Sequence, residues 1–142
     1  MLPLQGGIRV LPSRIHRCSG SDMRLYAVRI FVHDFERACA FYGQVLGLEE
    51  RYRSDEQGWA EYDVGGAGLG VERLAEDDPE AHLVGRFLGV SLMVEDIEAT
   101  HARLSAAGVE FTGAPETQPW GGVLAHLADP DGNVLTLLGR TA

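Results

Sequence analysis

Glu72 and Arg29 are the charged residues best suited to bind a small molecule inside this protein. The neighbours of Glu72, Val71 and Leu74, are apolar, and a carboxylate buried without a partner is costly. Alternation along the predicted strands directs Arg29 towards the same interior. Two interpretations follow. Either the two residues form a structural ion pair, or Glu72 binds a cationic or hydroxylated ligand.

Aromatic rings and one imidazole are the other candidate binding groups, because rings stack on flat ligands and attract cations. Trp120 lies in a loop rich in Pro and Gly, where it either contacts a ligand or caps the core. Trp59 begins a strand and serves either ligand stacking or dimer packing. Phe31 and His126 lie on predicted strands. Each of them either faces a ligand cavity or is an ordinary part of the core.

Composition and charge narrow the class of protein. The chain has 142 residues, 45% of them hydrophobic, and a formal net charge of −9. This charge favours cationic ligands and argues against nucleic acids and anionic membrane surfaces as partners. No apolar run approaches the roughly 18 residues of a membrane-spanning helix. Cys18 and Cys39 form neither a disulfide framework nor a metal motif, so we expect a cytoplasmic location.

An internal repeat shows how the chain is organised. Residues 25–34 match residues 87–96, and the identical pairs include Val28 with Val90, Val32 with Val94 and Asp34 with Asp96. We therefore predict a flexible N-terminal tail over residues 1–22, a single domain over 23–142, half-modules at about 24–74 and 87–140, and a linker at 75–86.

Each half shows the same order of predicted elements, namely a strand, a helix and three further strands. Asp34 and Asp96 are typical helix N-caps, and Gly47 and Gly108 are typical residues at helix C-termini. Apolar periodicity predicts helices at about 35–45 and 97–107. The later strands are predicted at Leu48–Ser54, Gly58–Val64, Ala67–Leu74, Val109–Gly113, Gly122–Ala128 and Asn133–Gly139.

One βαβββ unit cannot bury both faces of its sheet alone. We therefore predict an α+β fold in which two βαβββ modules form a curved, cavity-lining mixed sheet with the helices outside. By strand alternation, the residues that line the cavity are Ala27, Arg29 and Phe31 in the first half and Gly89, Ser91 and Met93 in the second.

The order and spacing of several motifs resemble the vicinal oxygen chelate superfamily, which includes glyoxalases, extradiol dioxygenases and bleomycin-resistance proteins. The resemblance covers roughly residues 24–140 and implies the fold described above, but it does not specify an activity. Its motifs are Phe41-Tyr42, Val45-Leu46-Gly47-Leu48, Leu104–Val109, Trp120-Gly121-Gly122 and Asp129–Asn133.

Metal-using members of this superfamily draw up to four His or Glu ligands from the first and last strands of each half. The resemblance places these positions at Ala27, Glu72, Gly89 and Thr136, of which only Glu72 keeps a ligating side chain. A catalytic zinc ion usually takes three protein ligands, and a non-haem iron takes two His and a carboxylate. We therefore predict no metal and no cofactor, which disfavours lyase or dioxygenase chemistry.

The resemblance is greatest to metal-free bleomycin-resistance-like proteins, around Gly58-Trp59 and Trp120-Gly121-Gly122. In that group a homodimer sequesters a flat cationic drug in acidic crevices lined by aromatic rings. The resemblance thus implies a homodimeric, metal-independent protein that binds a small organic ligand, either an antibiotic or a metabolite. The alternatives are a glyoxalase-like or dioxygenase-like enzyme with an atypical site, in which Glu72 could act as general base, and a protein-interaction domain.

Overall fold

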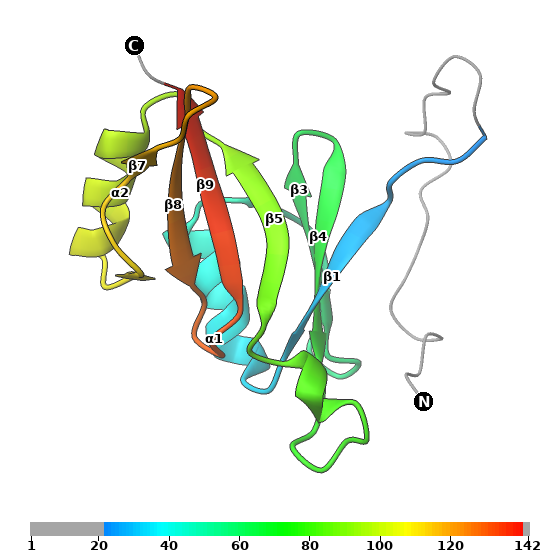
Figure 1. The fold of residues 1–142 in the computed structure, drawn as a ribbon. Coiled ribbons are helices and arrows are strands. Elements are labelled where there is room, and N and C mark those ends of the chain that lie inside the picture. Colours follow the sequence, from blue (N-terminus) through cyan, green and yellow to red (C-terminus); the bar gives the residue numbers. More distant parts are fainter. Residues whose placement is uncertain (1–21, 141–142) are drawn as a thin grey trace.

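The computed structural model describes residues 22–140, which form two βαβββ units (Figure 1). Most of the predicted N-terminal tail, including Cys18, lies outside these residues. The first unit contains β1 (Ala27–Val32), α1 (Phe35–Ala40), the π-helix η2 (Phe41–Val45), β2 (Glu49–Ser54), β3 (Trp59–Val64) and β4 (Ala67–Arg73).

The second unit follows a connection that contains the short 3-10 helix η3 (Ala81–Leu83). It contains β5 (Phe87–Met93), α2 (Ile97–Ala106), β6 (Glu110–Phe111), β7 (Glu116–Thr117), β8 (Gly122–Ala128) and β9 (Val134–Arg140). Two details differ from the prediction: the strand expected at 109–113 is paired only at Glu110–Phe111, and the two-residue strand β7 was not anticipated. Both strands pair along β8.

The α+β class and the βαβββ units are confirmed, but the strands are hydrogen-bonded as two sheets and not as one. The first sheet has the order β1-β4-β3-β2 and the second has the order β5-β9-β8-β6, with β7 also on β8. In each unit the first strand runs parallel to the last one, because the helix crosses over between them. The two sheets are therefore built alike.

The first helix differs from the regular α-helix that its apolar pattern predicts. After Ala40 the chain continues as the π-helix η2, and the backbone N–H of Leu46 donates to the carbonyl of Phe41 at 2.8 Å. The wider turn lets Phe41 and Tyr42 both lie in the core, with their rings in an edge-on contact.

The predicted helix caps are present in both units. The side chain of Asp34 accepts from the backbone N–H of Arg37 at 3.1 Å, and that of Asp96 accepts from Ala99 at 3.0 Å. Gly47 and Gly108 follow the helices with positive φ, the conformation that favours glycine.

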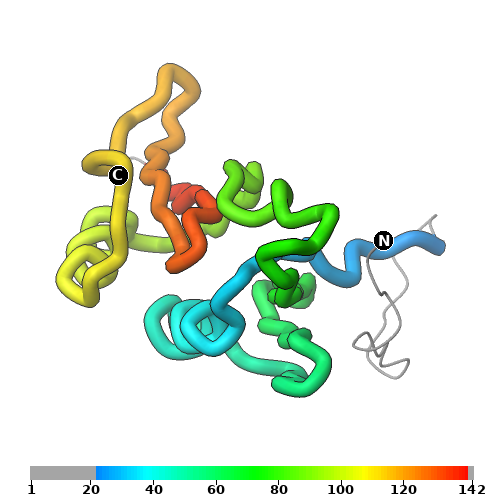
Figure 2. The backbone as a smooth tube through the Cα atoms, turned by 90° about the horizontal axis from the view of Figure 1, so that it is seen from below, coloured from blue at the N-terminus to red at the C-terminus, as the bar shows by residue number. Residues whose placement is uncertain are grey.

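The helices cover one face of each sheet. The first helix packs against β4 and α2 packs against β8 and β9, and Figure 2 shows α1 (cyan) and α2 (yellow) on one side of the molecule. Ile30, Val71, Leu135 and Leu137 are among the strand residues buried beneath them in one continuous core. The opposite faces of the sheets carry no helix of residues 22–140 and contain the candidate site.

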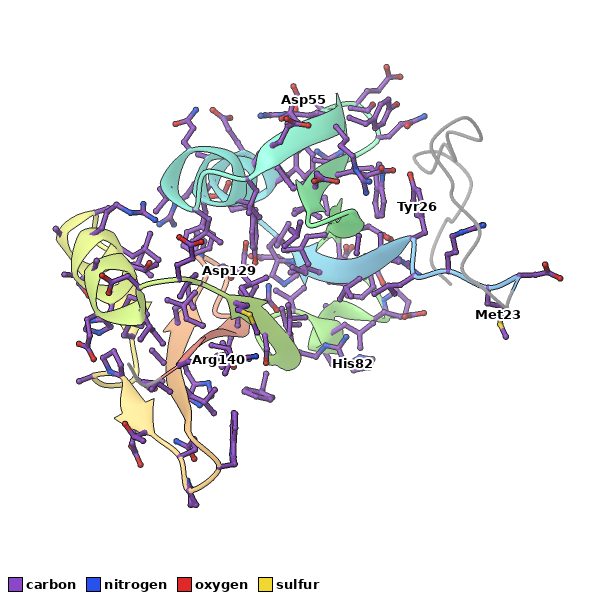
Figure 3. All side chains as sticks on the ribbon, turned by 90° about the horizontal axis from the view of Figure 1, so that it is seen from above. Met23, Tyr26, Asp55, His82, Asp129 and Arg140 are labelled. Carbon is purple, nitrogen blue, oxygen red and sulfur yellow. The ribbon has the colours of Figure 1, made fainter. Side chains whose placement is uncertain are left out.

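The turn 129–133 joins the two units. Asp129 accepts a hydrogen bond from the Tyr42 hydroxyl at 2.7 Å, and the Asn133 amide donates to the carbonyl of Phe31 at 2.9 Å. Figure 3 shows Asp129 in the interior, between the two helices. This turn therefore holds the two units in contact with each other.

Candidate ligand-binding site

Strand alternation assigns the side chains that face away from the helices. The first open face consists of Ala27, Arg29 and Phe31 on β1, Gly68, Gly70 and Glu72 on β4, and Trp59, Glu61 and Asp63 on β3. The second open face consists of Phe87, Gly89, Ser91 and Met93 on β5, Val134, Thr136, Leu138 and Arg140 on β9, and Leu124, His126 and Ala128 on β8.

Arg29 and Glu72 form the ion pair that the sequence allowed. Both Nε and Nη2 of Arg29 donate to Oε1 of Glu72, at 3.0 and 2.9 Å. The guanidinium also lies 5.2 Å from the ring centroid of Phe31, close enough for a cation–π contact. The side chain of Glu72 is 11% exposed and that of Arg29 is 28% exposed. The pair is thus fixed within the sheet face but still reachable from solvent.

A second buried carboxylate, Glu61, was not identified from the sequence. It accepts hydrogen bonds from the Tyr26 hydroxyl, at 2.8 and 2.6 Å to its two oxygens, and from Nε1 of Trp59 at 3.0 Å. Nη2 of Arg51 lies 4.0 Å from the same carboxylate. Alternation within β3 could have placed Glu61 beside Trp59, but no local signal indicates Tyr26 or Arg51 as partners.

Two glycines on β4 make room for these side chains. A Cβ atom at Gly70 would collide with the indole of Trp59, and one at Gly68 would collide with the guanidinium of Arg51. The ring of Trp59 therefore packs against Gly70 of β4 and is only 3% exposed. Close packing of this kind leaves the first open face filled by its own side chains.

The second open face has a row of hydroxyl and imidazole groups across three strands. Ser91 pairs with Thr136, and Thr136 pairs with His126. Nδ1 of His126 lies 2.9 Å from Oγ1 of Thr136, and the ring of Phe87 lies edge-on to the imidazole at 5.9 Å. His126 is half-buried, so one side of its ring remains accessible.

Large apolar side chains stand exposed around this row. Phe87, Met93 and Trp120 are 62%, 64% and 66% exposed. Met93, Trp120, Leu138 and Arg140 line a shallow pocket of about 340 Å³ at one end of the face. Trp120 lies in the predicted loop, and its ring covers Gly122.

The six predicted binding residues therefore fall into two groups. Arg29, Phe31, Trp59 and Glu72 lie together on the first open face, whereas His126 and Trp120 belong to the second open face and its border. Among residues 22–140, no hydrogen bond, ion pair or ring contact joins the two groups. Their roles in binding stay predictions.

Strand register corrects one position inferred from the resemblance. Arg29 pairs with Gly70 across β1 and β4, and Ser91 pairs with Thr136 across β5 and β9. Because Arg29 and Ser91 are equivalent in the internal repeat, the equivalent of Thr136 is Gly70 and not Glu72. A metal ion bridging a first and a last strand needs ligands on neighbouring positions of the two strands, which Glu72 does not satisfy.

The side chains at the corrected positions do not fit a metal ion. Ala27, Gly70 and Gly89 have no donor atom in their side chains, and the hydroxyl of Thr136 is already hydrogen-bonded. The indole of Trp59 fills the space beside Gly70. Throughout residues 22–140, no group of three or more His, Cys, Asp or Glu is arranged to hold a metal.

Several titratable groups have shifted pKa values, and all lie away from the second open face. Burial and then the Glu61 carboxylate raise the pKa of Tyr26 to about 12. Burial also raises the pKa of Tyr42, of Tyr62 and of the Cys39 thiol. For Asp129, burial raises the pKa despite opposing hydrogen bonds from Tyr42 and Asn133. The shifts of Tyr42, Tyr62, Cys39 and Asp129 reflect their burial in the core.

A family model described as the Glyoxalase/Bleomycin resistance protein/Dioxygenase superfamily matches residues 24–137. A bleomycin resistance protein of Klebsiella pneumoniae is 30% identical over 112 residues, which are 74% of this chain and 83% of that protein. In the described part of the chain, no helix is long and apolar enough to cross a membrane.

Two solved structures extend the comparison. A member of the same superfamily from Sphaerobacter thermophilus superposes with a TM-score of 0.71 at 29% identity, covering 83% of this chain and 98% of that one. TnmS3, an antibiotic binding protein from Streptomyces sp. CB03234, superposes with a TM-score of 0.64 at 28% identity, covering 84% of this chain and 97% of that one.

Proposed function

Because the chain belongs to the Glyoxalase/Bleomycin resistance protein/Dioxygenase superfamily, we propose that it is a metal-independent protein that binds a small organic molecule. The ligand class is an aromatic or cationic antibiotic or metabolite, which the protein sequesters without chemical change. One similar protein is a bleomycin resistance protein and another is an antibiotic binding protein, which supports this class.

The observation that carries the proposal is the set of side chains at the metal positions of the fold. Ala27, Gly70, Gly89 and Thr136 supply one hydroxyl oxygen between them, whereas a catalytic metal needs about three protein ligands. Recognition then depends on shape, aromatic rings and hydrogen bonds, and the two open faces supply all three.

The alternative of an enzyme with Glu72 as general base has less support. Oε1 of Glu72 accepts two hydrogen bonds from Arg29, so the guanidinium already occupies the lone pairs with which this oxygen would take a proton from a substrate. The pair fits better the binding of a cationic or hydroxylated ligand, because Oε2 of Glu72 has no hydrogen bond within residues 22–140.

We further propose that the protein is a homodimer in the cytoplasm. Leu25 and Met93 are large apolar side chains exposed in the single chain, and a second copy that covers them would remove apolar area from water. The net charge of −9 supports a protein that binds neither nucleic acid nor an anionic membrane.

Native mass spectrometry of the protein as purified, together with elemental analysis, tests the proposal. We expect a dimer without stoichiometric Zn, Ni, Fe or Mn after dialysis, and a retained organic ligand or a free site. A thermal-shift panel of cationic aromatic antibiotics and small α-hydroxy or α-keto metabolites then identifies the ligand class. Stoichiometric metal that survives dialysis contradicts metal independence, and a panel without any shift contradicts sequestration.

A further inference from the structure

The second open face differs in charge from the rest of the protein. Along β5, β8 and β9, all within the described residues, the side chains of this face include no Asp or Glu, and Arg140 at the end of β9 is the one permanent charge. The whole chain has a net charge of −9, and the first open face contains Glu61, Asp63 and Glu72. A cation therefore finds no counter-charge on these three strands.

The same face offers flat apolar contact. The exposed ring of Phe87 stands beside His126, and the exposed ring of Trp120 and the thioether of Met93 line the pocket at the other end of the face. Aromatic rings and methionine sulfur make favourable contacts with other aromatic rings, and apolar side chains gathered on one face mark a binding surface. An aromatic molecule is the ligand that this surface fits.

Two polar groups of the face have no partner within residues 22–140. One is the Ser91 hydroxyl, and the other is Nε2 of His126. Nδ1 of His126 is held by the Thr136 hydroxyl at 2.9 Å, which fixes the orientation of the imidazole and leaves Nε2 for a ligand. Because β5 and β8 flank β9, Ser91 and His126 lie about 10 Å apart across the sheet.

We propose that the second open face binds an uncharged, extended aromatic molecule with a hydrogen-bonding group at each end. Ser91 and His126 recognise the two ends, the ring of Phe87 beside His126 contacts the aromatic body, and Thr136 is a positioning residue for His126. This inference rests on the proposed function, since it names the ligand class of the same binding protein. It favours the aromatic over the cationic version of that function.

Three tricyclic probes of similar size test the proposal on the full-length protein. They are 2,7-dihydroxyxanthone, which is uncharged and has a hydroxyl on each outer ring, unsubstituted xanthone, and the cation proflavine. We expect isothermal titration calorimetry to give 2,7-dihydroxyxanthone a Kd at least about tenfold lower than that of either other probe, because xanthone lacks the two end hydroxyls and proflavine carries a positive charge.

Matched variants locate the site. Ser91→Ala and His126→Phe should each raise the Kd of 2,7-dihydroxyxanthone by about five- to tenfold, as the loss of one hydrogen bond requires. Ser105→Ala and His82→Phe make the same changes at exposed positions on α2 and η3 and should leave the Kd unchanged. Thr136→Val should weaken binding of 2,7-dihydroxyxanthone but not of xanthone, because it releases His126 without removing any aromatic contact.

Three results would overturn the proposal: proflavine binding as tightly as 2,7-dihydroxyxanthone, no binding of any probe, or variants of Ser91 and His126 that bind like the wild type. Analytical ultracentrifugation of the same variants gives a fourth test. If His126→Phe changes the dimer dissociation constant but not the Kd of the probe, the proposal is overturned. Tight binding of proflavine by metal-free protein would contradict this inference but not the proposed function. Stoichiometric metal retained after dialysis would contradict the proposed function, independently of how the three probes bind.

Discussion

The two tryptophans of this protein each lie over a strand glycine and have opposite environments. Each ring lies over a strand glycine: Trp59 over Gly70 and Trp120 over Gly122. Trp59 is 3% exposed and donates to Glu61 at 3.0 Å. Trp120 is 66% exposed and has the open pocket beside it.

The same contrast extends over the two open faces. On the first face, Glu61 and Glu72 find donors within their own sheet, so the face is largely satisfied internally. On the second face, apolar rings and polar groups remain available. The two units share one backbone arrangement, but the open face of the first is packed by its own side chains and the open face of the second keeps accessible groups. The two faces can differ in this way because no helix packs against them and constrains their side chains.

Alanine at the two tryptophans gives the largest expected difference. Trp59→Ala should lower the free energy of unfolding by about 3–5 kcal/mol, since it leaves a cavity and removes one of the hydrogen bonds to Glu61. Trp120→Ala should change stability by less than about 0.5 kcal/mol, because the ring is mostly in solvent. Urea denaturation followed by circular dichroism measures both. Equal losses would show that Trp120 is buried in solution, as in a tight dimer.

Alanine at the two glycines sharpens the comparison. Gly70→Ala should cost about 2–3 kcal/mol, because the new Cβ meets the immobile Trp59 indole. Gly122→Ala meets the exposed Trp120 ring, which can swing away into solvent, so its cost should stay below about 1 kcal/mol. Thermal unfolding compares the two variants. If Gly70→Ala unfolds like the wild type, the indole of Trp59 is not fixed across β4.

The Tyr26–Glu61 contact predicts a pH dependence for the first unit. The pKa of Tyr26 is raised to about 12 in the folded protein, whereas a tyrosine in the unfolded chain has a pKa of about 10. The protonated hydroxyl therefore contributes its full stabilisation of the fold below about pH 10. This stabilisation is then lost as the pH rises towards about 12. Tyr26→Phe should be less stable by about 1–2 kcal/mol at pH 8 and should lose less on going to alkaline pH.

Tyr52→Phe is the matched control for this experiment, because the Tyr52 hydroxyl has no hydrogen bond within residues 22–140. Urea midpoints at pH 8 and pH 11 give the comparison. Tyr42 and Tyr62 also have raised pKa values, so all variants should keep part of the alkaline loss. An identical pH response of Tyr26→Phe and wild type would contradict the role of Glu61.

The smallest effect is expected on the second face. Thr136→Val removes one hydrogen bond to a half-buried imidazole and should cost about 0.5–1.5 kcal/mol. Chemical denaturation measures this loss, and the NMR signals of the His126 ring report whether its orientation is released. Unchanged ring signals would show that Thr136 does not hold His126.

Much of the fold could be predicted from local patterns. Alternation gave the strands of both open faces, and Asp34, Asp96, Gly47 and Gly108 marked the helix ends because caps and left-handed residues depend on neighbouring backbone only. The Arg29–Glu72 pair is one of the two interpretations that the sequence leaves open, since both residues face one side of adjacent strands. The superfamily followed from motifs in the right order.

Other features depended on contacts between distant segments. Sequence spacing alone predicts Glu72 as the counterpart of Thr136 in the first unit, because spacing does not reveal cross-strand register. The pairing of Arg29 with Gly70 shows that the counterpart is Gly70. The π-helix after Ala40 arises from the demand to bury Phe41 and Tyr42 together, a demand that only the packed core creates.

The sequence by itself determined the two βαβββ units and their helix caps, because these depend on residue type and short-range geometry. Only the tertiary structure decided that Glu61 accepts hydrogen bonds from Tyr26 and Trp59. It also decided that the rings of Phe87 and Trp120 in the second unit are exposed. The reason is physical: whether a side chain on a sheet face is satisfied depends on which residues the neighbouring strands place against it.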